Sequence, residues 1–288
     1  MKLSSKHRGI LFILLAAFFF AGMGACVRLA GDVPTIQKSF FRNAVAFAVA
    51  AVLLAREHQG FLPQNKSNWP LLLARSLFGT IGILANFYAV SHLLLADASM
   101  LNKMSPFFAV IASYFLLKEK LSPTQLFTLV GAFAGALCII KPSFHNLSLV
   151  PALVGLAGGL CAGVAYTTVR MLGQRGERGP VIVFIFSGFS CLVALPFVLF
   201  RYSPMTGWQL LALLGAGLFA AGGQFSVTAA YCNAPAREIS VYDYSQVIFS
   251  ALIGFFLFGD VPDTLSFLGY ALICGMAFLN FRHNNKKS

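Results

Sequence analysis

Three polar residues and a proline share one pattern inside an apolar run of the sequence. Ser99, Asn102, Lys103 and Pro106 follow the i, i+3, i+4, i+7 pattern, so on a helix they share one face. The run that holds them, residues 96–117, is long enough to cross a bilayer. A charge at mid-bilayer costs about 2.5–3.5 kcal/mol on insertion scales, so such a residue normally faces a bundle interior or water. Lys103 therefore predicts a cavity for a solute, with snorkelling or a structural ion pair as alternatives.

A second polar stripe lies 141 residues further along the chain. It consists of Ser240, Asp243 and Tyr244, and Val247 stands where the first stripe has its proline. The two stripes predict paired walls of one cavity. If the two spans run in opposite directions, the Cα atoms of Lys103 and Asp243 differ in depth by roughly 12 Å, and their side chains lean apart. We therefore expect these two side chains to flank a substrate rather than contact each other.

Pro106 and Arg42 are assigned structural or gating roles. Proline has no N–H and clashes with the carbonyl group of Asn102, which loses its helical partner. Within lipid that carbonyl needs protein, water or a ligand, although a simple packing kink is the alternative. Arg42 lies about 9 Å into its span. Arg28 and Arg75 are close enough to the membrane interfaces to snorkel.

Other polar side chains in apolar runs are candidates for substrate binding or for hydrogen bonds between helices. They are Asn86, Tyr88 and His92, then Tyr166 and Thr167, then Gln224, Ser226 and Thr228. Asn86, Tyr88, Tyr166 and Gln224 join the two stripes as predicted substrate-binding residues. The close glycine pairs Gly131/Gly135 and Gly159/Gly163 predict tight helix packing.

The elements that must position these residues are membrane helices. The 288-residue chain is 58% hydrophobic and only 10% charged, far below the charge content of soluble domains. At about 20 apolar residues per crossing, it contains ten predicted spans. They are 9–30, 36–55, 70–92, 96–117, 123–140, 149–171, 180–200, 207–231, 237–258 and 264–281.

The basic residues predict the orientation of these spans. With the N-terminus inside, fourteen of the 21 Lys and Arg residues fall in cytoplasmic segments, three in outer segments and four within spans. By the positive-inside rule, both termini are therefore expected in the cytoplasm of a multi-pass cell-membrane protein. Because the net charge of +12 is spread between apolar runs, we expect no nucleic-acid partner.

The two halves of the sequence repeat each other. VRL at 27–29 returns as VRM at 169–171, and FLLKEK at 115–120 returns as FLFGDV at 256–261. Since five is odd, a duplicated five-helix unit inserts in opposite orientations, a hallmark of secondary transporters. We expect two inverted repeats, residues 1–142 and 143–288, around a central cavity.

These residues also resemble a known family. FFRNAV around Arg42, FYAV and LLADAS, SPFFAVIASYFLLKEKLS, AYTTVRML, and VYDYSQVIFSALIGFFLFGD resemble, in that order, the EamA-like transporters of the drug/metabolite transporter superfamily. The resemblance implies ten helices and alternating access around a cavity lined mainly by spans 1, 3, 4, 6, 8 and 9. This sequence departs from an exact duplication at Val247, so we expect only the first half to carry the proline kink.

The predicted function is secondary transport of a small organic metabolite, an amino acid or related zwitterion, with tyrosines able to stack on an aromatic or purine-like group. Import of a nucleotide-like or adenosyl metabolite is an alternative. Asp243 is a candidate carrier of a coupling proton. A membrane enzyme acting on lipid-linked substrates would need clustered acids, and no D-x-x-x-D or H-x-x-x-H cluster occurs. No metal or cofactor is expected, and the six Cys lie in apolar runs as small packing residues.

Overall fold

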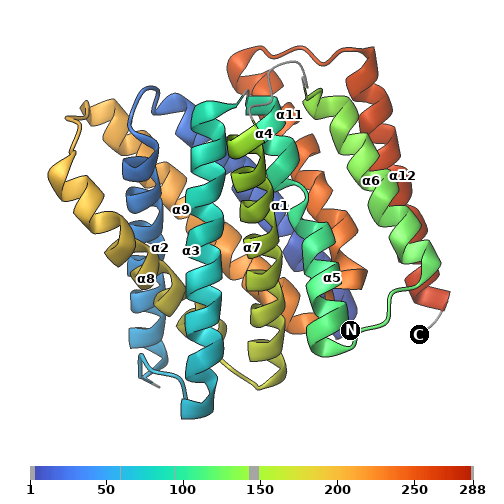
Figure 1. Ribbon diagram of the computed structural model, residues 1–288, viewed down its shortest axis with the longest axis horizontal. Helices are drawn as coiled ribbons and strands as arrows, with labels where there is room; N and C mark the ends of the chain where they lie inside the picture. The colour runs from blue at the N-terminus through green and yellow to red at the C-terminus, as the bar shows by residue number, and fades with distance from the viewer. Residues whose placement is uncertain (1–3, 59, 94, 143–148, 287–288) are drawn as a thin grey trace.

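This computed structural model describes residues 4–58, 60–93, 95–142 and 149–286, and they form helices joined by short loops, with no strand among them (Figure 1). Ten of the described helical segments are long and apolar enough to cross a membrane. The predicted all-α membrane fold is therefore confirmed. The helices are α1 (Ser5–Leu29), α2 (Thr35–Glu57), η1 (Lys66–Asn68), α3 (Trp69–His92), α4 (Leu95–Asn102), α5 (Ser105–Leu117), α6 (Pro123–Ile140), α7 (Leu149–Gln174), α8 (Gly179–Phe200), α9 (Gly207–Asn233), α10 (Ala236–Ile239), η3 (Ser240–Tyr244), α11 (Ser245–Phe258) and α12 (Thr264–Lys286).

Consecutive spans run up and down, and both termini lie at the same end of the bundle (Figure 1). Helix α1 begins at that end and α7 begins at the opposite end, as expected when five spans precede the second half. The expected boundary between residues 142 and 143, like the basic residues Lys2 and Lys287, falls on segments outside the described residues.

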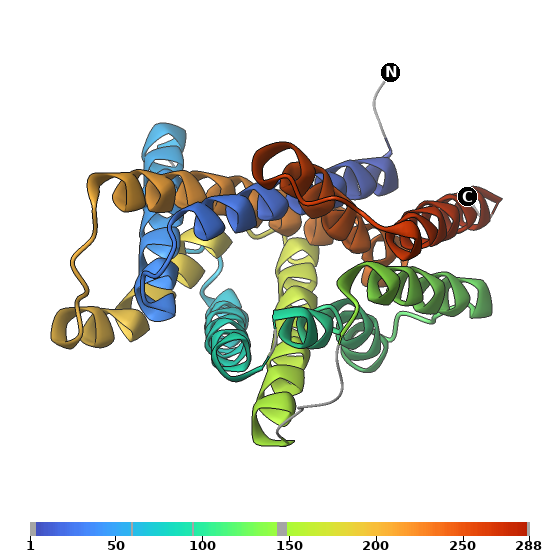
Figure 2. The same cartoon turned by 90° about the horizontal axis from the view of Figure 1, so that it is seen from above.

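The helix contacts of the two halves mirror each other. Helix α1 packs on α9 and α11, while α7 packs on α3 and α5. Two further helix pairs lie on opposite lateral sides of the bundle: α2 with α8, and α6 with α12 (Figures 1 and 2). If α1–α6 correspond to α7–α12 in order, each contact has its counterpart. This pattern places α4, α5, η3 and α11 between the halves.

The fourth span is interrupted at its polar stripe. Helix α4 ends at Asn102 and α5 begins at Ser105, with Pro106 in its first turn. Pro106 lacks an N–H and cannot continue the ladder, so the amide N–H groups of Phe107 and Phe108 both reach back to the Met104 carbonyl oxygen. The break expected from the proline is confirmed.

The ninth span is interrupted as well, although Val247 stands where the fourth span has Pro106. The proline kink itself is found only in the fourth span of the two, as expected, but the ninth span also departs from a regular helix. The short helix α10 leads into the 3₁₀ segment η3, and α11 follows. The amide N–H of Ser245 bonds to the carbonyls of Tyr242 and Asp243, and the Ser245 hydroxyl donates to the same Tyr242 oxygen at 2.7 Å. A serine hydroxyl that competes for a helix carbonyl favours such tightening, and it needs no proline.

Close glycine contacts hold the helices around these breaks. A Cβ atom on Gly135 would lie 2.8 Å from the carbonyl oxygen of Gly269, and one on Gly163 would lie 2.6 Å from the backbone nitrogen of Ala109. These separations confirm the predicted packing role of Gly135 and Gly163, at the α6–α12 and α5–α7 contacts respectively.

Candidate functional site

The two interrupted spans meet at an ion pair. Lys103 Nζ lies 3.3 Å from Asp243 Oδ2 and donates a hydrogen bond to Gln246 Oε1 at 2.7 Å. The side chains of Lys103 and Asp243 are 13% and 17% exposed, so the pair is largely shielded but accessible. The Tyr244 hydroxyl donates to the Lys103 carbonyl at 3.0 Å. The polar residues of the two breaks therefore contact each other directly.

The expectation that Lys103 and Asp243 stand apart is wrong. It treated both spans as ideal helices with a rise of about 1.5 Å per residue. The 3₁₀ segment around Asp243 rises about 2.0 Å per residue, which carries Asp243 further toward the middle of its span, and the flexible lysine stem covers the remaining gap. The Lys103 carbonyl loses its helical partner because the Phe107 amide bonds to Met104, and it accepts from the Tyr244 hydroxyl instead. The partner of the Asn102 carbonyl stays a prediction.

Tyr166 links this ion pair to two arginines. The phenol group of Tyr166 interacts electrostatically with Asp243, Arg75 and Arg42, so all three charges lie near it. Its ring stacks on that of Tyr231 with centroids 5.0 Å apart and planes 8° apart. Tyr231 is buried and Tyr166 is partly accessible. The stacked pair forms a flat apolar wall beside the charges.

Arg75 is buried in the interior, and the expectation that it snorkels is wrong. Only 3% of the residue is exposed. Its Nη2 donates to Gln224 Oε1 at 3.2 Å, and its guanidinium lies 3.9 Å from the ring centroid of Phe186. A Cβ atom on Gly79, one turn later on α3, would collide with Arg75 Nη1 and lie 2.7 Å from the Phe186 ring. The glycine thus makes room for the guanidinium to fold along its own helix into the bundle.

Arg42 on α2 reaches the same region. Its guanidinium is close enough to that of Arg75 for the two charges to repel each other. The Nε atoms of both arginines are buried, and neither has a hydrogen-bond partner among the described residues. Arg75 and Tyr231 are the residues that the sequence reasoning missed here, together with Gln246.

The remaining predicted residues lie partly in the cluster formed by Lys103, Asp243, Tyr166, Arg75 and Arg42 and partly elsewhere. Gln224 and Tyr166 belong to the cluster, and Ser240 is buried beside it with a hydroxyl that has no partner in the described part of the chain. Ser99 and Asn102 are partly exposed on α4, and the backbone of Asn86 packs near Gly158 of α7. Tyr88 is 40% exposed and stacks on His92 of its own helix, with centroids 4.1 Å apart.

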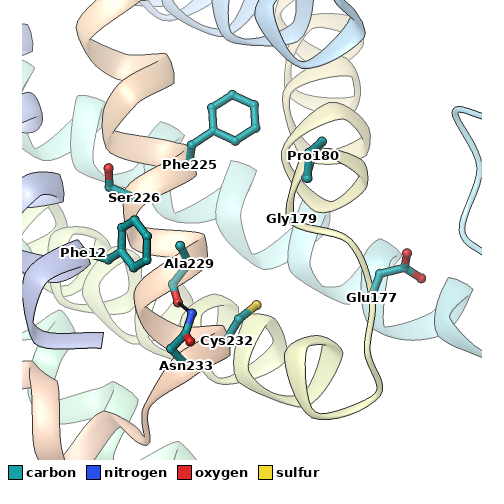
Figure 3. Close-up of a pocket in the computed structure, with 9 residues that line it drawn as sticks. All are labelled: Phe12, Glu177, Gly179, Pro180, Phe225, Ser226, Ala229, Cys232 and Asn233. Atoms are coloured by element: carbon teal, nitrogen blue, oxygen red, sulfur yellow. Dashed lines mark hydrogen bonds between the residues drawn. The ribbon is translucent and has the colours of Figure 1, made fainter. Parts of the chain in front are cut away.

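A cavity of about 400 Å³ opens at the end of the bundle that holds the termini (Figures 1 and 3). Phe12, Glu177, Ser226 and Asn233 line it, with further residues of α8 and α9. The Glu177 carboxylate accepts from the Asn68 side chain at 2.8 Å and from the Arg178 amide at 3.1 Å, so it ties loops together. The cavity does not include the ion pair, and Ser226 is the one sequence candidate on its wall.

The described residues offer no cluster of three or more His, Cys, Asp or Glu side chains that could hold a metal ion. Their six cysteines are free thiols, five partly buried and one exposed.

Comparison with known proteins identifies relatives over the whole length of the chain. The sequence profile of the EamA-like transporter family matches residues 7–141 and again residues 149–282. The pseudopaline exporter CntI of Pseudomonas aeruginosa is 32% identical over 277 residues, 95% of each chain. The riboflavin transporter of Brucella anthropi is 25% identical over 96% of this chain and 99% of the relative.

One solved crystal structure shares the fold, with a TM-score of 0.81 and 21% identity over 94% of this chain and 95% of the other.

Proposed function

We propose that this protein, which belongs to the EamA-like transporter family, exports a small zwitterionic metabolite across the cell membrane. That it is a multi-pass membrane transporter of small metabolites rather than an enzyme follows from its family, its relatives and its ten apolar spans. The substrate class and the direction are our proposal. The observation that carries the proposal is the Lys103–Asp243 ion pair where two interrupted spans meet.

A shielded ion pair selects for a ligand that carries both signs of charge. Removing one partner of a buried pair is strongly unfavourable, by roughly 3–5 kcal/mol, because the other charge is left without compensation. A lone anion or cation that opened the pair would leave this cost uncovered. A zwitterion presents its carboxylate to Lys103 and its ammonium group to Asp243, and so replaces both halves of the contact.

The interrupted helices supply the movable part. Irregular backbone at membrane depth is tolerated where it lines a cavity, and the binding sites of secondary transporters often lie at such breaks. In our proposal, substrate that separates Lys103 from Asp243 also loosens the Tyr244 contact to the Lys103 carbonyl. The two halves, residues 1–142 and 143–288, then exchange the side on which the site is open.

Three features support the proposed direction and orientation. CntI, a relative along nearly the full chain, is an exporter. Most basic residues lie in segments expected to be cytoplasmic. The cavity lined by Phe12 and Asn233 opens at the end where the termini lie, which makes it a cytoplasmic vestibule if both termini are inside. Asp243 is the proposed proton carrier if transport is proton-coupled.

The test is ligand-induced stabilisation of the purified full-length protein, because a ligand that binds only the folded state raises the melting temperature. The panel contains neutral amino acids, the matching amines and carboxylic acids, nucleosides and adenosyl compounds. We expect zwitterions to stabilise the wild type, and amines or acids alone to stabilise it far less.

Lys103→Met and Asp243→Asn are the test variants, and Arg28→Gln is the control, since Arg28 forms an exposed ion pair with Asp260. Loss of zwitterion stabilisation in both test variants but not in the control supports the proposal. Equal stabilisation of wild type and Lys103→Met contradicts it, and selective stabilisation by nucleosides favours the nucleotide-like alternative.

A further inference from the structure

Two arginines in the interior have no negatively charged partner among the described residues. Arg75 is 3% exposed, and its only side-chain hydrogen bond in the described part of the chain is to the neutral amide of Gln224. Arg42 makes no ion pair with a described residue, and its buried Nε has no hydrogen-bond partner there. Charged groups within a membrane are costly and are normally paired or functional. We therefore expect these two arginines to bind an anion that the described residues do not supply.

Other arginines of the same protein show what a structural role looks like. Arg170, 16% exposed, pairs with Glu119 at 3.4 Å and donates to the carbonyl oxygens of Tyr231 and Cys232. Arg178 likewise pairs with Glu57 and donates to two loop carbonyls. Both guanidinium groups are tied to several acceptors on neighbouring elements. Within the described part of the chain, Arg75 has one neutral acceptor, Gln224, and Arg42 has none, so helix packing does not account for their charge.

The arginines belong to the same polar region as the proposed zwitterion site. Gln224, which accepts from Arg75, and Tyr231, which stacks on Tyr166, lie seven residues apart on one face of α9. The charges of Arg42, Arg75 and Asp243 all act on the Tyr166 phenol. The region holds three cations, Arg42, Arg75 and Lys103, and one described anion, Asp243. Two positive charges thus remain when Lys103 and Asp243 are paired. A neutral zwitterion would leave this excess uncompensated, whereas a ligand with additional negative charge would neutralise it.

We propose that Arg42 and Arg75 form an anion subsite, so that the transported solute is an acidic zwitterion that carries a second oxyanion group, a carboxylate or a phosphate. Guanidinium groups bind both groups through paired, charge-assisted hydrogen bonds. The unpartnered Nε–H groups of both arginines are the donors left free for this contact. The inference rests on the zwitterion site proposed above and names the class of its substrate.

The experiment compares acidic zwitterions with their neutral isosteres on the full-length purified protein. Glutamate and 2-aminoadipate test a second carboxylate, and O-phosphoserine tests a phosphate. Glutamine and serine are the neutral partners. A hydrogen bond to a charged group contributes about 1.5–3 kcal/mol, so we expect the better acid to bind roughly ten- to hundredfold more tightly than its isostere. Whichever acid shows the larger preference identifies the second anion.

Arg42→Gln and Arg75→Gln should each lower this preference toward unity while weak binding of glutamine or serine persists. The variants Arg42→Lys and Arg75→Lys keep the charge but lose the two-donor geometry. Their preference for the acid over its isostere should lie between those of the wild type and the glutamine variants. Gly79→Ala displaces the Arg75 guanidinium without removing its charge, and serves if Arg75→Gln fails to fold. Arg28→Gln is the exposed control and should keep the full preference.

Equal binding of acids and isosteres by the wild type overturns the subsite, as does a preference that survives in folded Arg42→Gln and Arg75→Gln. Failure of the underlying proposal looks different, because Lys103→Met would then bind every zwitterion as the wild type does.

Discussion

The fourth and the ninth span are both interrupted beside the Lys103–Asp243 ion pair, but the two interruptions have different structural causes. In the first half, Pro106 removes a backbone donor and separates α4 from α5. In the second half Val247 stands where the first half has Pro106, and the chain tightens into the 3₁₀ segment η3 between α10 and α11. The first break contributes a cation and a carbonyl group without a helical partner, and the second contributes an anion and a phenol. A duplicated fold has thus acquired two chemically complementary surfaces, Lys103 facing Asp243 and the Lys103 carbonyl facing Tyr244.

Removing either charge of the Lys103–Asp243 ion pair should have the largest effect on stability and transport. Lys103→Met leaves Asp243 without its cation, and Asp243→Asn leaves Lys103 without its anion. Because both side chains are mostly shielded, we expect each single variant to lose about 3 kcal/mol of stability and transport to fall at least tenfold. The measurements are denaturation of the protein in detergent and export from proteoliposomes.

The double variant Lys103→Met/Asp243→Asn sharpens the result. It removes both charges, so it should be more stable than either single variant while transport stays lost. If the stability losses of the two single variants simply add in the double variant, the two breaks are not coupled through this pair.

The second prediction concerns the backbone contact between the breaks. Tyr244→Phe removes the hydroxyl that satisfies the Lys103 carbonyl at 3.0 Å, within a side chain that is fully buried. Leaving a buried acceptor without its donor costs about 1–3 kcal/mol. We expect a matching drop in the free energy of unfolding, measured by chemical denaturation.

Pro106→Ala distinguishes which break needs that phenol. Alanine removes the proline ring clash, so the helix can become regular and the Phe107 N–H, which now bonds to Met104, can bond to the Lys103 carbonyl. The Pro106→Ala background should therefore reduce the cost of Tyr244→Phe. An unchanged cost in that background would mean that Tyr244 stabilises its own 3₁₀ segment instead.

The sequence predicted the spans well because length and hydropathy suffice to place them. It predicted the first break because a proline inside a helix always removes one backbone N–H donor. It did not predict the second break, because Ser245 is an ordinary helix residue until its hydroxyl finds the Tyr242 carbonyl. The distance between Lys103 and Asp243 was misjudged for the same reason, since it was counted along ideal helices.

The prediction for Arg75 was wrong because it used only the depth of Arg75 in the membrane and not the face of α3 on which it lies. Gly79, one turn later, is the signal that could have placed it, since a missing side chain there makes room for a guanidinium inside the bundle. Tyr88 on the same helix is 40% exposed and stacks on His92, so its predicted role in substrate binding stays a prediction.

The third prediction compares a glycine beside the first break with one in the first helix. A Cβ atom on Gly163 would meet the backbone of Ala109 at 2.6 Å, and one on Gly22 would meet the ring of Phe219 at 2.6 Å. A ring can rotate or shift, whereas a helix backbone must move as a unit. We therefore expect Gly163→Ala to lower stability by about 1–3 kcal/mol and Gly22→Ala to lower it less.

Gly24→Ala is the matched control, because nothing lies within 4 Å of its Cβ position. It should raise stability by roughly 0.5–1 kcal/mol, the helix preference of alanine over glycine. Equal losses in Gly22→Ala and Gly163→Ala would show that the α5–α7 contact is no more rigid than the α1–α9 contact.

The smallest expected effect belongs to an exposed ion pair, which contrasts with the shielded central one. Lys141 Nζ lies 2.5 Å from Asp263 Oδ1 at the end of the bundle, with side chains 40% and 56% exposed. The hydrogen bond from Lys141, followed by those from Ser266, lowers the pKa of Asp263 to about 2. A carboxyl group whose pKa is lowered on folding contributes stability above its unfolded pKa, near 4, and loses it as the pH falls toward 2. We therefore expect wild type and Asp263→Asn to differ slightly in melting temperature at pH 6 and to converge as the pH falls from 4 to 2.

Salt separates this pair from the central one. Exposed charges are screened within about 3 Å at 1 M salt, and shielded pairs are screened much less. The difference between wild type and Asp263→Asn at pH 6 should therefore shrink in 1 M NaCl, while the difference between wild type and Asp243→Asn persists. If both differences shrink alike, water and ions reach the Lys103–Asp243 pair as freely as they reach the surface, and a ligand with both signs of charge would no longer be needed to open it.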